Sequence, residues 1–186
     1  MSNIYFTSDL HLGHKNIIQY CNRPFVSIDE MNKVLIDNWN SVVKSNDTVY
    51  QLGDFSFNKN PKTYLSQLNG NIIHIWGNHD RKRYLGELPK KLTLQHRNMD
   101  ILLLHDPSFI FNPYDIDNVY LTEIASKCDY IFCGHVHEKW KYNKLGFTYI
   151  DGYLIQVYNV PVINVGVDVW DYKPVNIEEL IKFKNE

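Results

Sequence analysis

Five short apolar runs in this sequence are each followed at once by aspartate, asparagine or histidine. The five junctions read Asp9-Leu10-His11, Gly53-Asp54, Gly77-Asn78-His79-Asp80, His105-Asp106 and Gly134-His135-Val136-His137. Short apolar runs bounded by turn residues are typical of buried strands. In an open α/β sheet, sites gather beyond the carboxyl ends of the strands. We therefore expect a fold that brings all five junctions to one edge of a sheet core.

Helical patterns alternate with these strands along the chain. The clearest helix is expected over residues 27–43, where Ser27 and Glu30 have the spacing of a capping box and apolar residues recur on one face. Other helices are expected at 61–68, 119–127 and 176–183, the last with Asn176 as its cap and Glu179 as the cap's partner. Strands are expected at 4–7, 48–52, 72–76, 101–104, 130–133, 154–158 and 162–167, with a hairpin over 149–154 that turns at Asp151-Gly152. We expect residues 1–186 to form one mixed α/β domain with helices outside a sheet core.

The composition limits the partners that this chain can have. Nineteen Lys and Arg against 21 Asp and Glu leave a formal charge of -2, so no long-range field attracts duplex DNA or an anionic bilayer. No apolar run is long enough to cross a membrane, and the first residues lack a secretory signal pattern. The three cysteines, Cys21, Cys128 and Cys133, form no C-x-x-C pair. We interpret them as reduced thiols of a cytoplasmic protein.

The side chains at the five junctions have the chemistry of metal ligands. Seven of them offer an oxygen or nitrogen donor: Asp9, His11, Asp54, Asn78, His105, His135 and His137. A single tetrahedral zinc site is filled by fewer donors, whereas this number suits two divalent cations that share a carboxylate. The lack of cysteine among them favours manganese, with iron, zinc or nickel as alternatives. Any one junction alone is an ordinary turn, but five together are hard to explain by chance. Two further histidines, His74 and His96, lie inside strand patterns, and we interpret them as structural.

These motifs resemble those of the calcineurin-like metallophosphoesterases. The shared pattern is Asp9-x-His11, Gly53-Asp54, Gly77-Asn78-His79-Asp80, His105 and Gly134-His135-x-His137, in that order. The resemblance implies two facing mixed β-sheets flanked by helices, with a pair of metal ions between them. It assigns Asp9, His11 and His137 to one ion, Asn78, His105 and His135 to the other, and Asp54 to both. It also implies that His79 protonates the leaving oxygen of a phosphoester, while the ions activate water for in-line attack.

Two positions depart from the pattern of many phosphatases in this family. Where the resemblance leads us to expect an orienting aspartate and a phosphate-clamping arginine, the chain has Phe57 and Asn58. This difference argues against a protein serine/threonine phosphatase, and it leaves Asp80 or a backbone carbonyl to orient His79. The cations nearest the motifs are His14, Lys15 and Arg81. Each of them is either a substrate contact or part of a solvated face.

The substrate is expected to be a small phosphoester, because little chain remains for an added cap domain. The aromatic stretch 107–120 either stacks a base or aryl group or covers the core or a dimer contact. We therefore expect a phosphodiesterase for a small nucleotide or a similar ester, with a phosphomonoesterase as the alternative. A nuclease is a second alternative, since Lys139, Trp140, Lys141, Tyr142 and Lys144 interleave cations and aromatics as a single-strand platform does. A non-catalytic scaffold is disfavoured, because the chain keeps all the motif residues; the oligomeric state is open.

Overall fold

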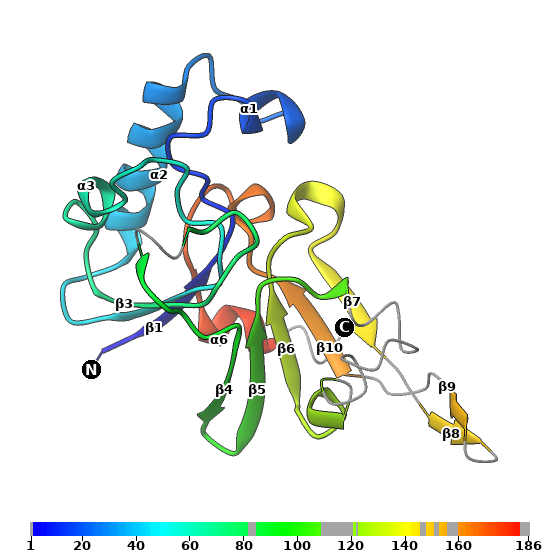
Figure 1. Cartoon of the computed structure of the whole chain (residues 1–186). Coiled ribbons are helices and arrows are strands. Elements are labelled where there is room, and N and C mark those ends of the chain that lie inside the picture. Colours follow the sequence, from blue (N-terminus) through cyan, green and yellow to red (C-terminus); the bar gives the residue numbers. More distant parts are fainter. Residues whose placement is uncertain are drawn as a thin grey trace.

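The computed structural model describes residues 2–81, 85–108, 121, 123–145, 148–150, 153–155 and 160–182. Its strands form two mixed sheets and a separate hairpin (Figure 1). The first sheet has the order β11-β1-β2-β3, formed by Val175–Asn176, Ile4–Thr7, Thr48–Gln51 and Asn71–His74. The second has the order β4-β5-β6-β10-β7, formed by Lys91–His96, Met99–Leu104, Tyr130–Cys133, Val160–Asn164 and Tyr142–Leu145. Both sheets combine parallel and antiparallel neighbours, as the resemblance implies.

The two sheets face each other across a shared apolar core. Phe6 of β1 packs with Ile101 of β5, Phe132 of β6 and Ile163 of β10, and all four side chains are fully buried. The Phe6 and Phe132 rings meet edge to face with their centroids 4.9 Å apart, a favoured arrangement for aromatic pairs. This contact holds the two sheets together and so fixes the distance between the loops that follow their strands.

Helices cover the outer faces of both sheets. The long helix α2, Ile28–Val42, buries Met31, Leu35 and Trp39 in the same cluster as Val49 of β2. On the outer face of the second sheet, the helical segment around Ala125 joins a second apolar cluster. The shorter helical elements are α1 (Ile17–Tyr20), α3 (Lys62–Leu65), α6 (Ile177–Leu180), η2 (His137–Lys139) and η3 (Val167–Val169). The predicted arrangement of facing sheets flanked by helices is confirmed.

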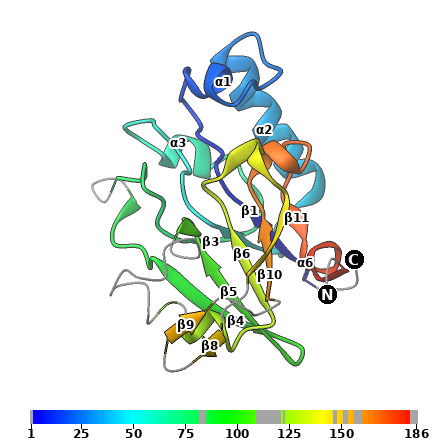
Figure 2. The same cartoon turned by 90° about the vertical axis from the view of Figure 1, so that its right-hand side faces the viewer.

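Local signals place most of the elements correctly. The Ser27 hydroxyl accepts the Glu30 N–H at 3.1 Å, as predicted. Asn176 is also confirmed as a cap, but it accepts the N–H of Glu178 at 2.9 Å and not that of the predicted partner Glu179. The hairpin of β8 (Thr148–Ile150) and β9 (Tyr153–Ile155) pairs as expected. In both cartoon views it lies at the end of the molecule away from α1 (Figure 2).

Several boundaries differ from the sequence predictions. Helix α3 ends at Leu65 rather than Leu68, and β3 ends at His74 rather than Trp76. The structure adds β4, whose alternating apolar and polar residues do not form a continuous apolar run. His74 and His96 lie within β3 and β4, as expected. No helix within the described ranges has the length and hydropathy of a membrane span.

Candidate metal centre

The loops that follow five strands bring the seven predicted ligand side chains together. Asp9 and His11 follow β1, Asp54 follows β2, Asn78 follows β3, His105 follows β5, and His135 and His137 follow β6. These strands belong to both sheets, so the cluster lies where the loops of the two sheets meet. The convergence that the sequence predicts is therefore present in the fold.

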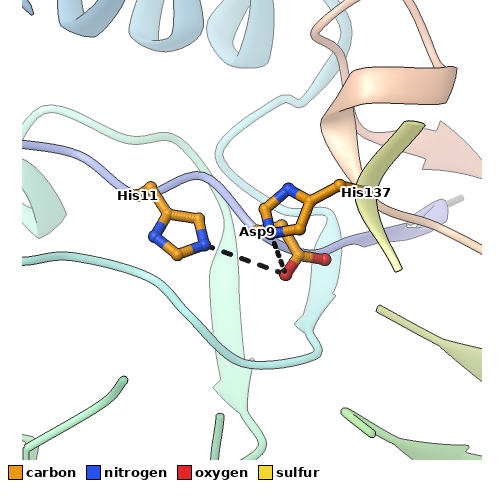
Figure 3. A group of neighbouring side chains, drawn as sticks. All are labelled: Asp9, His11 and His137. Atoms are coloured by element: carbon orange, nitrogen blue, oxygen red, sulfur yellow. Dashed lines mark ion pairs between the residues drawn. The ribbon is translucent and has the colours of Figure 1, made fainter. Parts of the chain in front are cut away.

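One group of donors consists of Asp9, His11 and His137 (Figure 3). The Asp9 Oδ1 atom lies 4.0 Å from His11 Nε2 and 3.8 Å from His137 Nε2. The ligand atoms of the three residues all lie within 4.8 Å of one another. A cation placed among them would contact one carboxylate oxygen and two imidazole nitrogens, which is a donor set typical of divalent transition metals.

A second group of donors surrounds Asn78. Its Oδ1 atom lies 2.9 Å from His105 Nε2 and 3.0 Å from His135 Nδ1. Asp54 connects the two groups, because its Oδ2 atom lies 3.4 Å from His11 Nε2 and 3.5 Å from His105 Nε2. One carboxylate oxygen therefore faces a nitrogen from each group, which is the position that a bridging ligand needs.

The chemistry of these residues fits bound cations. The His11 Nε2 atom is buried and has no hydrogen-bond partner among the described residues, and an unpaired buried polar atom is costly. Asp9 and Asp54 are carboxylates exposed by only 0% and 2%. Buried charges of this kind are normally paired or coordinate a metal. A divalent ion between them would satisfy both the nitrogen and the carboxylates.

The backbone at the cluster is held in an uncommon conformation. Asp9, His11, Asp54, His135 and His137 all have φ angles between 48° and 70°. A residue other than glycine in this left-handed region costs on the order of 1–3 kcal/mol. Five such residues at one cluster show that the fold directs these side chains toward one another although the backbone conformation of each is unfavourable.

Glycines make the convergence possible by leaving space. A Cβ atom on Gly77 would lie 2.3 Å from Asp54 Oδ1, and one on Gly134 would lie 2.5 Å from Asp9 Oδ2. A Cβ on Gly77 would also meet the Asp54 backbone nitrogen, and one on Gly134 the Ser8 hydroxyl, so only glycine fits at either position.

Burial and neighbouring charges perturb the histidines in opposite directions. Burial lowers the pKa of His11 to about 2, in spite of the nearby Asp54. Burial also acts to lower the pKa of His105 and His137, but carboxylates outweigh it. Hydrogen bonding to Asp54 helps to raise the pKa of His105 to about 9, and hydrogen bonding to Asp168 helps to raise that of His137 to about 10.

Three residues at the cluster were not predicted from the sequence. Asp168 Oδ2 lies 2.8 Å from His137 Nδ1, and the buried Arg23 donates to both oxygens of Asp168. Arg23 also donates to the backbone carbonyl of Asp9 at 2.6 Å. Cys21 forms a further donor group with His137 and Glu138. A signal for Asp168 does exist, because Gly166-Val167-Asp168 follows β10 as other ligand loops follow their strands.

His79 lies beside the cluster among aromatic rings. Its backbone N–H donates to Asp54 Oδ1 at 2.8 Å, which ties its loop to that carboxylate. Its ring centroid lies 5.1 Å from that of Phe57 and 5.6 Å from that of His11. The residue that replaces the expected aspartate, Phe57, also stacks on His14 with centroids 3.7 Å apart. The rings of Phe57 and His11 thus lie beside His79 where a carboxylate was expected.

Asp80 has a different task from the one considered for it. Its two oxygens accept the backbone N–H groups of Gly77 at 2.9 Å, Asp54 at 3.0 Å and Phe55 at 3.0 Å. The carboxylate therefore joins the loop after β2 to the loop after β3, and it is used by the backbone rather than by the His79 ring.

The candidate substrate contacts lie at different places. His14 lines a hollow of about 270 Å³ together with His11, Tyr20, His79, His137 and Lys139. Lys15 lines a separate hollow beside Ser27, and Arg81 is exposed. Lys82, Arg83 and residues 109–120, including the predicted aromatic wall, lie outside the described residues. All three cysteines are free and buried.

Comparison with known proteins agrees with this geometry. The calcineurin-like phosphoesterase superfamily domain matches residues 3–166. An uncharacterized protein of Methanocaldococcus jannaschii is 37% identical over 186 residues, covering 98% of this chain and 91% of its own. The gene 66 protein of Mycobacterium phage L5 is 39% identical over 85 residues, covering 43% of this chain and 41% of its own. A crystal structure of a protein of unknown function from Aquifex aeolicus has a TM-score of 0.73 and 32% identity, covering 98% of this chain and 100% of that one. The matched region includes every candidate ligand, and the chain belongs to the calcineurin-like phosphoesterase superfamily.

Proposed function

We propose that this protein hydrolyses a phosphodiester of a small nucleotide or a related ester, using two divalent metal ions. The observation that carries the proposal is the place of Asp54, whose Oδ2 atom lies within 3.5 Å of a nitrogen from each donor group. In the proposed assignment, Asp9, His11 and His137 hold one ion, and Asn78, His105 and His135 hold the other. Manganese is the expected metal, since the seven proposed ligands are carboxylate, amide and imidazole groups and none of them is a thiolate.

The side chains around the ions would have distinct tasks. When bound, two divalent ions supply positive charge to the phosphoryl oxygens and lower the pKa of a water molecule. His79 would give a proton to the departing alkoxide; its exposure and its position in the same hollow as His11 and His137 support this role. The hydrogen bond from the His79 N–H to Asp54 holds the His79 loop next to the carboxylate that is proposed to bridge the two ions.

A diester is favoured because each donor group borders its own hollow. One hollow, of about 270 Å³, is lined by His11, His137 and His79. The other, of about 360 Å³, is lined by Asn78 and His105. A phosphate held between the two groups would have room for an ester arm on either side. A monoester has one arm and would fill only one of these hollows.

Hydrolysis of chromogenic esters tests this proposal. With added manganese, bis(4-nitrophenyl) phosphate should turn over faster than 4-nitrophenyl phosphate, and a strong preference for the monoester would contradict the diester assignment. Asp54→Asn and His79→Ala should each abolish most of the activity while circular dichroism shows a folded protein. Wild type that is fully loaded with metal and hydrolyses no ester would instead favour the scaffold.

A nuclease is less well supported by the described surface. In the segment that was considered as a single-strand platform, Lys141 Nζ lies 3.5 Å from the centre of the Trp170 ring, and Lys144 Nζ lies 5.8 Å from that of Tyr142. Both lysines therefore lie over aromatic rings of this chain. The faces of Trp170 and Tyr142 that these lysines cover are not offered to the bases of a nucleic acid. Salt-dependent binding of a single-stranded oligonucleotide would reverse this preference.

A further inference from the structure

A hollow of about 360 Å³ beside the candidate metal centre has the character of a ligand pocket. We propose that this hollow, the Trp76 pocket, binds the alcohol that stays on the phosphate after hydrolysis, and that this alcohol carries an uncharged flat ring such as a nucleobase. The inference rests on the proposed function, which it deepens by naming the pocket that binds the retained arm of the substrate and the kind of ring on that arm.

The walls of the Trp76 pocket are suited to a flat apolar surface. Trp76 is half-buried, so part of its indole is free to contact a ligand, and Leu104 and Leu121 add aliphatic surface. Ligand pockets have volumes of about 300–1,000 Å³ and are lined mainly by apolar and aromatic side chains with a few polar groups. The volume of this pocket and the mainly apolar surface that its lining residues expose to it both agree with that description.

The position of the pocket assigns it to the retained arm of the substrate. Asn78 and His105 belong both to the candidate metal centre and to the pocket lining, so an occupant reaches the phosphate without a further linker. His79, the proposed proton donor, lines the other hollow. The leaving group must lie near the proton donor, which places the arm that is not released in the Trp76 pocket.

Charge decides between two ligands that an indole ring can hold. Tryptophan stacks on flat rings, and it also binds cations such as a quaternary ammonium group. Lys90 and Lys91 line this pocket, while Asp106 is the one carboxylate among its lining residues. An ammonium group in the lining repels a cationic head group and has no such effect on an uncharged base. The observations therefore favour a nucleobase over a choline-like group.

Three diesters with the same 4-nitrophenolate leaving group test the proposal. Their retained groups are thymidine, methyl and choline, and the release of nitrophenolate is followed by absorbance with manganese present. The quantity of interest is the ratio of kcat/KM for the thymidine ester to that for the methyl ester, measured on one preparation. A ratio does not depend on the fraction of folded enzyme, so a loss of stability in a variant does not mimic the effect.

Trp76→Ala should lower this ratio about tenfold, in the range found when an aromatic partner of a base is removed. Trp76→Phe keeps a ring and should restore most of the ratio. Tyr20→Ala removes an aromatic side chain from the hollow assigned to the leaving group, so it should change both esters by the same factor. Wild type should also prefer the thymidine ester to the choline ester.

Other outcomes would overturn the proposal in distinguishable ways. An unchanged ratio in Trp76→Ala would remove the pocket from substrate recognition while leaving the phosphodiesterase activity in place. An equal loss on both esters would assign the pocket to the leaving group. A preference for choline that depends on Trp76 would replace the nucleobase by a cation. Metal-loaded wild type that hydrolyses none of the three esters would refute the proposed function and this inference with it.

Discussion

Replacing Asp168 by asparagine should weaken the binding of one metal ion and leave the other in place. The Asp168 carboxylate lies 2.8 Å from His137 Nδ1. A carboxylate only accepts hydrogen bonds, so Nδ1 keeps its proton, and a cation that displaces the second proton binds at Nε2, which faces Asp9 at 3.8 Å. Burial acts to raise the pKa of Asp168, but His137 and Arg23 lower it overall, so the group is ionised near neutral pH.

The asparagine side chain would change the tautomer of His137. Its oxygen can still accept from Arg23, whose Nε donates to Asp168 Oδ1 at 2.8 Å. Its NH₂ group then faces His137 Nδ1, and Arg23 Nη2 loses the acceptor that Oδ2 provides at 3.0 Å. The proton would move to Nε2 and block the lone pair that a metal needs. Loss of such an orienting partner costs about 10–100-fold in metal affinity, which is about 1.4–2.7 kcal/mol. Arg23 keeps its hydrogen bonds to the Asp9 and Leu10 carbonyls, so the variant is expected to fold.

Titration calorimetry with manganese measures this effect directly. We expect wild type to show two binding events per chain. Asp168→Asn should lower the affinity of one of these events about 10–100-fold. Asp171→Asn is the matched control, because Asp171 is exposed and lies three residues away; it should leave both events unchanged. A folded Asp168→Asn protein that binds both ions with wild-type affinity would refute the reasoning.

Three further predictions follow from the loops around the centre. In the metal-free protein the pKa values of His105 and His137 are raised to about 9 and about 10, so ions must displace protons there. Metal affinity should rise with pH through neutrality and level off above these values; calorimetry in buffers of different ionisation enthalpy should detect the released protons, and their absence would contradict the assignment. Gly77→Ala should destabilise the fold or abolish metal binding, because its Cβ would lie 2.2 Å from Asp54 N; thermal unfolding and metal content measure this, and a wild-type result in both would count against the close approach. Asp80→Asn should lower the free energy of unfolding by about 1–3 kcal/mol, since an NH₂ group would replace an acceptor of backbone N–H groups; denaturant unfolding measures it, and an unchanged midpoint would show that these bonds are unimportant.

The sequence predicts the convergence of the seven candidate side chains well because they are tied to local patterns. Each of the seven side chains follows a short apolar run, and such a run indicates both a strand and the place where it ends. The direction of neighbouring strands then brings loops such as those of Asp9 and Asp54 together, with the Asp9 N–H donating to the Gly53 carbonyl at 3.1 Å. Membership of the superfamily could be inferred from these residues alone.

Contacts between distant segments could not be predicted in the same way. Arg23 and Asp168 are 145 positions apart, and no local pattern relates an arginine after a short helix to an aspartate after β10. Phe57 was noticed only as a missing carboxylate, since its stacking on His14 depends on how two loops pack. The Trp76 pocket likewise combines residues from loops after β3 and β5, so its shape exists only in the folded chain.

Anomalous diffraction from crystals soaked in manganese chloride tests the central claim most directly. We predict two anomalous peaks per chain on either side of the Asp54 carboxylate, one among Asp9, His11 and His137 and one among Asn78, His105 and His135. In crystals of Asp54→Asn at least one of the peaks should be lost. A single peak, or none, in fully soaked wild-type crystals would contradict a centre of two ions.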